Sequence, residues 1–379
     1  MSESKIMNME GNRKMKSHFI YIDCLTEGDY KYYVPGNCNC LVKQRIADNE
    51  LEIIAYFSNM PVTQKCTYRK VIKWKEKIIC IPWHSTDFIV VDEKTSNIKY
   101  IKIPQMNRAK IKHAFFFEAK LIGSQIYAFG YNYCGILKFD CDTLESKILD
   151  NWINAYRIKA SYDAEVMFTP EMIFHNNRLY TICTAFPGIF EFDLENEKYH
   201  FFCIEKEGAK LSHINVDENL IYISTKNNEI IIFNKQKNEI EQIVDLNSWC
   251  EKEDSILYLV VNKESIDVFM GDRKNVLILS KKKPDKIVKI NLPKAFVKNS
   301  SVIPYKSEID SETVLFCDFP YSEMFVYTKS NRQITQLSIN IPQNVLNMKQ
   351  YLRMHAILDE DSSKGFSLDN YIKMVLEET

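Results

Sequence analysis

Residues 125–140 read QIYAFGYNYCGILKFD, in which two runs rich in Ile, Leu, Phe and Tyr flank a loop that contains Gly130 and Gly135. The second run ends at Asp140, 15 residues after Gln125. Branched and aromatic residues favour strands, and a glycine-containing loop between two such runs is typical of an antiparallel pair. The stretch therefore predicts two neighbouring strands joined by a loop.

The same pair of runs recurs along the chain. Six such runs end at anchor positions 92, 140, 193, 234, 280 and 328, and their partner runs begin 15 residues earlier in five units and 14 earlier in the fourth. A further apolar run follows each anchor and another precedes each pair, which gives four predicted strands per unit. A period of about 40–50 residues with four strands is typical of a β-propeller blade.

The beginning of the chain provides a weaker seventh unit. Residues 41–45 and 51–54 predict its third and fourth strands, and Phe19–Asp23 predicts its second. No innermost strand precedes Phe19, so we expect residues 353–358 to supply one and close the ring, which would remove the free sheet edges. We predict an all-β protein with seven four-stranded blades, with six blades as the alternative.

The two ends of the chain differ from the repeats in composition. Residues 1–17 are polar and lysine-rich and predict a disordered leader without a secretory signal, followed by the propeller over residues 18–358. Residues 359–379 form a tail. Within it, Ser367 is a candidate N-cap and apolar residues recur on one face, which predicts a short amphipathic helix over residues 367–378.

Composition excludes several function classes. The chain has 49 basic and 50 acidic residues and a net charge of −1, so electrostatics do not favour nucleic acid or an anionic membrane as the partner. No apolar run approaches the roughly 20 residues that a membrane-spanning helix needs. The 11 cysteines, without a secretory signal, predict reduced thiols and a cytoplasmic location. Cys38 and Cys40 lack further ligands at zinc-finger spacing, and no cofactor motif is present, so we expect neither metal nor cofactor.

The units resemble the Kelch-like and WD-repeat-like β-propellers of bacteria, in which each blade has a short strand, a loop, an apolar run ending in Asp, a turn and a strand. The chain departs from these families because it lacks the double glycine of Kelch repeats and the Trp-Asp dipeptide of WD repeats. The resemblance implies a scaffold that binds a ligand or partner on one face. It also implies a less common alternative, an enzyme built around the central channel.

One face of the predicted disc has the composition of a binding surface. We call it the loop face, because it carries the loops between second and third strands and the connections between blades; the opposite face is the hairpin face. Aromatic and hydrogen-bonding side chains gather in the loops, whereas the hairpins read as charged turns. The candidate ligand-binding residues are Arg69, Trp83, His84, Tyr131, Tyr133, Phe186, Arg273, Asp318 and Tyr321.

These residues predict recognition of a protein, a peptide or a glycan. Trp83 is the sharpest candidate, because it lies in an inter-strand loop where a large ring has little blade core to fill. The alternative is that Trp83 folds over the neighbouring blade and only stabilises it. The anchor residues Asp92, Asp140 and Asp193 recur once per blade, so we assign them to turns, in which Asp accepts from backbone amides two residues on.

Catalysis has weaker support in the sequence. The candidates are His113, Arg157, Asp163 and His213, with His213 and Asp163 as a possible base and acid. No nucleophile elbow and no phosphate-binding glycine loop is present. If Arg69, His113, Arg157 and His213 converged within hydrogen-bond reach, the enzyme alternative would gain support. The sequence therefore favours a non-catalytic binding module, with a lyase, hydrolase or cyclase of the propeller kind as the alternative.

Overall fold

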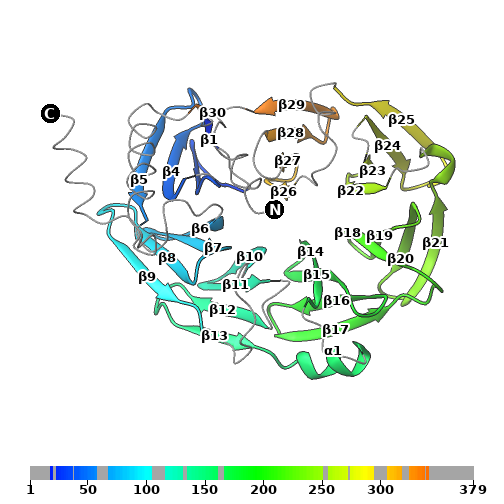
Figure 1. The fold of residues 1–379 in the computed structure, drawn as a ribbon, viewed down its shortest axis with the longest axis horizontal. Helices are drawn as coiled ribbons and strands as arrows, with labels where there is room; N and C mark the ends of the chain where they lie inside the picture. The colour runs from blue at the N-terminus through cyan, green and yellow to red at the C-terminus, as the bar shows by residue number, and fades with distance from the viewer. Residues whose placement is uncertain are drawn as a thin grey trace, which may run out of the picture.

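The fold is a ring of seven four-stranded antiparallel sheets around a central axis (Figure 1), which confirms the predicted all-β propeller. The structure is a computed structural model. It describes residues 18–19, 23–36, 38–57, 67–104, 116–130, 135–160, 166–250, 255–271, 274–293, 305–317, 324–337 and 339–340. Within each sheet the strands follow one another in chain order, from the innermost strand to the outermost.

The first three blades are built from residues 25–149. Blade 1 contains β2 (Leu25–Glu27), β3 (Tyr30–Tyr33), β4 (Cys40–Arg45) and β5 (Leu51–Tyr56). Blade 2 contains β6 (Tyr68–Trp74), β7 (Lys77–Pro82), β8 (Asp87–Asp92) and β9 (Ile98–Lys102). Blade 3 contains β10 (Glu118–Ile122), β11 (Gln125–Phe129), β12 (Ile136–Asp140) and β13 (Ser146–Leu149).

The last four blades follow the same order. Blade 4 contains β14 (Phe168–His175), β15 (Arg178–Cys183), β16 (Gly188–Asp193) and β17 (Lys198–Cys203). Blade 5 contains β18 (Leu211–Asp217), β19 (Leu220–Thr225), β20 (Glu229–Asn234) and β21 (Glu239–Asp245). Blade 6 contains β22 (Ile256–Val261), β23 (Ser265–Met270), β24 (Asn275–Ser280) and β25 (Ile287–Asn291). Blade 7 contains β26 (Tyr305–Glu308), β27 (Thr313–Cys317), β28 (Met324–Thr328) and β29 (Gln333–Leu337).

The first blade differs from the prediction. Its innermost and second strands are β2 and β3, so the second strand is Tyr30–Tyr33 and not Phe19–Asp23, and all four strands of the described blade come from residues 25–56. Instead β1 (His18–Phe19) pairs antiparallel with β30 (Ile339–Asn340) in a separate two-stranded sheet. The two ends of the ring are thus joined outside the blades. Residues 353–358 and the helix predicted over 367–378 lie outside the described residues.

Two helical segments occur in the described part of the chain. Helix α1 (Ile153–Ala160) follows the outermost strand of blade 3 and lies at the rim of the ring (Figure 1); sequence analysis treated this segment as a plain connection. It docks through Trp152 and Tyr156, which are buried against Phe168 and Phe190. The second is a short 3-10 helix η1 (Asn247–Trp249) between blades 5 and 6. Neither these nor any other described helix is long and apolar enough to span a membrane.

The anchor positions form the turns that sequence analysis assigned to them. The Oδ1 atom of Asp92 accepts hydrogen bonds from the backbone N–H groups of Lys94 and Thr95, at 3.1 and 2.8 Å. Asp140, Asp193 and Asn234 make the same pair of bonds to the residues two and three positions on. A side chain that accepts from these amides stabilises the tight turn between the third and fourth strands.

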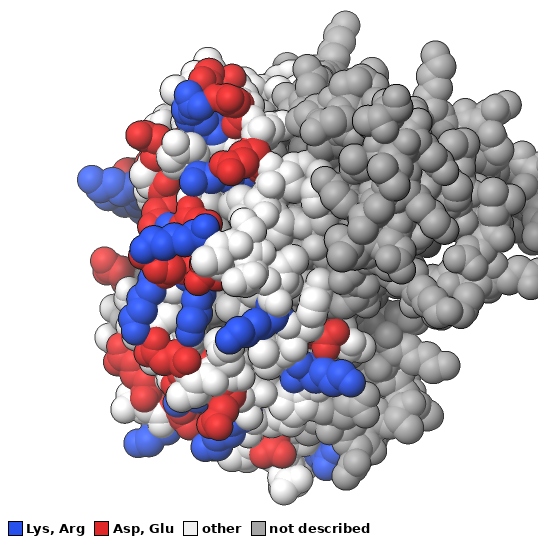
Figure 2. Space-filling view, turned by 90° about the vertical axis from the view of Figure 1, so that its left-hand side faces the viewer, with Lys and Arg blue, Asp and Glu red and all other residues white. Residues whose placement is uncertain are grey.

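Second-strand tyrosines connect neighbouring blades near the hairpin face. Tyr32 in β3 donates to Glu93 of blade 2 at 2.7 Å, and Glu93 also pairs with Lys43 and Lys73. Tyr127, Tyr180 and Tyr222 occupy the same position in β11, β15 and β19, each with a lysine ammonium over its ring. On the side of the ring seen in Figure 2, Lys and Arg lie among Asp and Glu on the described part of the surface.

Candidate functional site

The central channel contains a cavity of about 1000 Å³ that every blade helps to line. The innermost strands β2, β6, β10, β14, β18, β22 and β26 provide its wall, together with residues that directly flank them. The longest continuous stretches of wall come from blades 4 and 7, through residues 169–174 and 306–311, and blades 2 and 3 add residues 69–73 and 117–121. The cavity is large enough for a drug-sized ligand or a few residues of a peptide.

Seven of the lining residues share one position in the repeat. Each lies seven residues before the first residue of the second strand of its blade, and each lines the cavity. We call this set the channel ring. In blade order it consists of Asp23, Lys70, Glu118, Glu171, His213, Tyr258 and Lys306. Because these residues lie before or near the beginning of the innermost strands, the ring lies toward the loop face, where the chain enters each blade.

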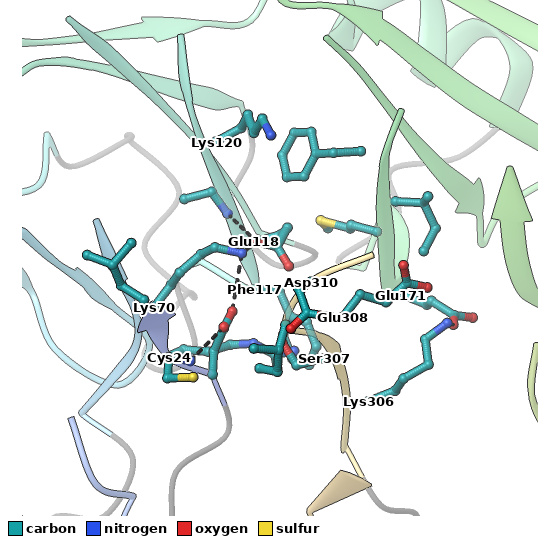
Figure 3. Close-up of a pocket in the computed structure, with 18 of the residues that line it drawn as sticks. Cys24, Lys70, Phe117, Glu118, Lys120, Glu171, Lys306, Ser307, Glu308 and Asp310 are labelled. Carbon is teal, nitrogen blue, oxygen red and sulfur yellow. Dashed lines mark hydrogen bonds and ion pairs between the residues drawn. The ribbon is translucent and has the colours of Figure 1, made fainter. Parts of the chain in front are cut away.

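The first three members of the channel ring form one group of ion pairs. The Lys70 ammonium group pairs with Asp23 at 3.2 Å and with Glu118 on its other side, so it bridges blades 1 and 3 (Figure 3). The two carboxylates raise the pKa of Lys70 although burial opposes this, and the lysine stays charged. The carboxylates also accept backbone amides, Asp23 from Cys24 at 2.7 Å and Glu118 from Ala119 at 3.0 Å.

The remaining four members form a second group around Glu171. One carboxylate oxygen lies 3.1 Å from Nδ1 of His213 and accepts the backbone N–H of Ile214 at 3.0 Å. The other oxygen lies 2.7 Å from the ammonium group of Lys306. Lys306 belongs to blade 7 and Glu171 to blade 4, so this contact reaches past blades 5 and 6. Tyr258 of blade 6 lies between His213 and Lys306. Its ring centroid is 5.2 Å from that of His213, and the Lys306 ammonium group lies over its ring.

The Glu171–Lys306 pair within the second group is buried and ionised. The side chains of Lys306 and Glu171 are 4% and 10% exposed. Burial by itself would raise the pKa of Glu171, but Lys306 and His213 outweigh it and lower the pKa to about 2. Because a buried ion pair needs both partners, removing either would leave an uncompensated charge in the wall of the channel.

The two groups are not connected to each other between blades 3 and 4. Within the described residues, no hydrogen bond or ion pair joins Glu118 to Glu171, although the two occupy the same position in adjacent blades. Both carboxylates are already satisfied by the partners given above. The channel ring is therefore interrupted between blades 3 and 4, and within the described residues no hydrogen bond or ion pair joins Lys306 of blade 7 to Asp23 of blade 1 either.

The structure places two of the predicted site residues in the cavity wall. Arg69 and His213 line the cavity, from blades 2 and 5 respectively. The Arg69 guanidinium group lies over the Phe117 ring, 3.9 Å from its centroid. His213 pairs with Glu171, whereas its expected partner Asp163 lies outside the described residues. Arg157 is on α1 at the rim of the ring, away from Arg69 and His213 in the cavity wall. His113, like Asp163, lies outside the described residues. The described residues therefore do not show the convergence of these side chains that would have favoured catalysis.

Trp83 is placed differently from the expectation. Its side chain is 2% exposed and belongs to a hydrophobic core cluster that also contains Phe117, just before blade 3. The ring stacks on His84 at 4.9 Å between centroids and meets Phe117 edge-on at 5.8 Å. The expectation that the Trp83 ring has little hydrophobic core to pack into was wrong, because Phe117, at the beginning of the next blade, packs against it. This packing supports the stabilising role, and ligand stacking on Trp83 stays a prediction.

The other predicted ligand residues divide into two sets. Phe186 is partly buried and packs against Tyr156 of α1 and Phe201 of β17, at 5.3 and 5.9 Å between ring centroids, so it covers the core of blade 4. His84 is half-buried beside Trp83. The remaining members lie outside the described residues: Tyr131, Tyr133, Arg273, Asp318 and Tyr321. Their role in binding stays a prediction.

Sequence reasoning missed most of the channel ring, although a signal was present. The repeat was aligned by its apolar runs, and the fixed spacing of seven residues before the second strand was not tested for polar residues. Asp23, Lys70, Glu118, Glu171 and Lys306 occur at that spacing in five of the seven units. Their charges differ in sign, so no single residue type recurs. No group of His, Cys, Asp and Glu in the described residues is arranged to hold a metal ion.

Comparisons with known proteins agree on the fold. No protein-family model and no curated protein matches the sequence. Among solved structures, the computationally designed protein Ika8 is similar over 85% of this chain and 87% of its own, with a TM-score of 0.53 and 8% identity. YCF48 bound to D1 peptide is similar over 86% and 94%, with a TM-score of 0.53 and 8% identity. BamB from Moraxella catarrhalis is similar over 79% and 82%, with a TM-score of 0.49 and 11% identity. At such identities the likeness shows the fold alone.

Proposed function

We propose that this protein is a non-catalytic binding module that captures a peptide or an extended protein segment at the loop-face mouth of its central channel. The observation that carries this proposal is the cavity of about 1000 Å³ with a ring of charged residues toward the loop face. Concave sites with a few fixed polar groups and apolar walls are the usual form of ligand sites. The solved structure of YCF48, which has a similar fold, holds a peptide, and this supports the same class of ligand here.

A peptide is favoured over a glycan by the state of the aromatic residues. Sugar recognition needs open ring faces, and the two described aromatic candidates, Trp83 and Phe186, are packed against neighbouring rings. The charged groups of the channel ring instead suit the polar backbone and charged side chains of a peptide. The Kelch-like or WD-repeat-like assignment, the cytoplasmic location and the exclusion of nucleic acid stay predictions.

Peptide-library selection followed by hydrogen exchange tests this proposal. Peptides are selected on the folded protein, and amide exchange is then measured with and without the tightest one. We expect protection at the beginning of β10, β14 and β26, near Glu118, Glu171 and Lys306. The hairpin turn at residues 92–95 provides the internal control and should not change. Failure to select any peptide, or protection confined to the hairpin turns, would contradict the proposal.

A further inference from the structure

A second level of the channel lies one step further along the innermost strands. Its residues are five positions before the second strand of each blade, two residues beyond the channel ring, so they lie on the same side of the strand. We call this set the lower ring. In blade order it consists of Leu25, Ile72, Lys120, Ile173, Asn215, Val260 and Glu308, of which all but the buried Asn215 and Val260 line the cavity.

The lower ring is mainly aliphatic, and its polar members are engaged with one exception. Asn215 donates to Glu308 at 3.3 Å, and Glu308 also pairs with Lys329 at 3.4 Å. Lys120 stands between Ile72 and Ile173 in the blade order, and all three line the cavity. Figure 3 shows the Lys120 ammonium group directed into the cavity.

Lys120 differs from the other lysines that line the cavity. Among the four lysines in the described part of the wall, Lys120 alone has a side chain with neither a hydrogen bond nor an ion pair to another described residue. Lys70 and Lys306 are held by carboxylates, Lys73 pairs with Glu27 and Glu93, and Asp310 accepts the backbone N–H of Glu312 at 2.8 Å. A ligand can therefore gain an ionic contact at Lys120 without breaking one inside the protein.

The position of Lys120 also fits the break in the channel ring. It lies on β10, two residues after Glu118, and residues of both β10 and β14 line the cavity. Phe174 of β14 lines the same part of the cavity and is only half-buried. The nearby carboxylate of Glu118 is held by Lys70, which it shares with Asp23, and it is not paired with Lys120. The available chemistry is one cation beside aliphatic and aromatic side chains.

We infer that the channel beneath the channel ring is a subsite for an apolar group that ends in a carboxylate, with the carboxylate on Lys120 and the apolar group against Ile72, Ile173 and Phe174. The carboxylate is either that of a small organic acid or the terminal carboxylate of a peptide. This inference rests on the proposed function, because the subsite would bind one end of a ligand that enters through the loop-face mouth of the channel.

Matched acids and amides test the subsite. The probes are 4-phenylbutyrate and its neutral amide, and the peptide Ala-Ala-Ala-Phe with a free or an amidated C-terminus; binding is measured by calorimetry. Because a charged hydrogen bond contributes about 1.5–3 kcal/mol, we expect at least one acid to bind the wild type about tenfold or more tightly than its amide. The pair that shows this preference identifies the source of the carboxylate.

Two variants separate Lys120 from general electrostatics. K120M keeps the aliphatic stem and removes the charge, and it should abolish the preference for the acid. K99M removes an exposed, unpaired lysine on the outer strand β9 and should retain the preference. Thermal unfolding of both variants checks that they fold.

Three results would overturn the subsite: no acid binds the wild type, acid and amide bind equally, or K120M keeps the preference. The proposed function can fail separately. A library-selected peptide that protects the loop face and binds K120M as tightly as the wild type would refute the subsite and leave the binding module intact.

Discussion

At the scale of single residues, the buried pair of Glu171 and Lys306 makes the sharpest stability prediction. E171Q leaves the Lys306 ammonium group charged with its side chain 4% exposed. Removing one partner of a buried pair typically costs about 3–5 kcal/mol. We therefore expect urea unfolding at pH 7 to show a loss of this order in the free energy of unfolding.

The surface provides a matched control for this variant. Glu264 forms an ion pair with Lys282 in which both side chains are well exposed, so E264Q should unfold like the wild type. The double variant E171Q/K306M removes both charges and should be less destabilised than the sum of its single variants. A fully additive cycle would show that the two residues are not coupled.

The same carboxylate predicts a dependence on acid. The pKa of Glu171 in the folded protein, about 2, lies below its ordinary value of 4.5. A depressed pKa means that the stabilisation is complete above pH 4.5 and is lost as the pH falls toward 2. The difference in unfolding free energy between the wild type and E171Q should therefore shrink from pH 7 to pH 3. A constant difference over this range would contradict the assigned ionisation.

At the scale of elements, the second-strand tyrosines allow one position to be compared in two blades. Tyr32 donates to the ionised Glu93, whereas the Tyr222 hydroxyl is buried and has no hydrogen-bond partner among the described residues. Y32F should lose about 1.5–3 kcal/mol of stability, the contribution of a hydrogen bond to a charged group. Y222F should be neutral or slightly stabilising, because no bond is lost. If chemical unfolding showed the same loss of unfolding free energy for Y32F and Y222F, the hydrogen bond from Tyr32 to Glu93 would not be the stabilising contact.

The elements were predictable where their pattern was repeated. The offset of 15 residues located the second and third strands, because a half-buried strand needs apolar side chains in a fixed register. The anchor aspartates were predictable because the turn chemistry depends only on nearby backbone. Helix α1 was not, since its sequence INAYRIKA has weak helical periodicity and its docking depends on Phe168 and Phe190, which come from the next blade.

At the scale of the whole molecule, the pairing of β1 with β30 closes the ring outside the blades. Each blade is built from one continuous segment, so removing residues 1–22 would delete β1 without removing a blade strand. We expect the truncated protein to keep its strand content by circular dichroism and to unfold at a lower temperature, because the ends of the ring are no longer joined. An unchanged unfolding temperature would show that the pair does not contribute to closure.

The candidate site shows what repeat patterns leave out. The channel assembles Asp23, Lys70, Glu171 and Lys306 from residues up to 283 positions apart, and only the ring geometry brings them together. Sequence analysis found Arg69 and His213 of this wall, but it assigned Trp83 to an open surface because the contact with Phe117 is made by the following blade. Contacts between blades are set by closure of the ring, and local sequence does not encode them.

Blocking the channel tests the central claim, that the ligand enters it, most directly. Ser212 directly precedes His213 of the channel ring and lines the cavity, so S212W places a large ring at the loop-face side of the channel, whereas T335W adds the same ring on the outer strand β29. The measurement is the affinity of a library-selected peptide for each folded variant. The account predicts that S212W binds about tenfold or more weakly than the wild type and that T335W binds like the wild type. Unchanged affinity of S212W would contradict it.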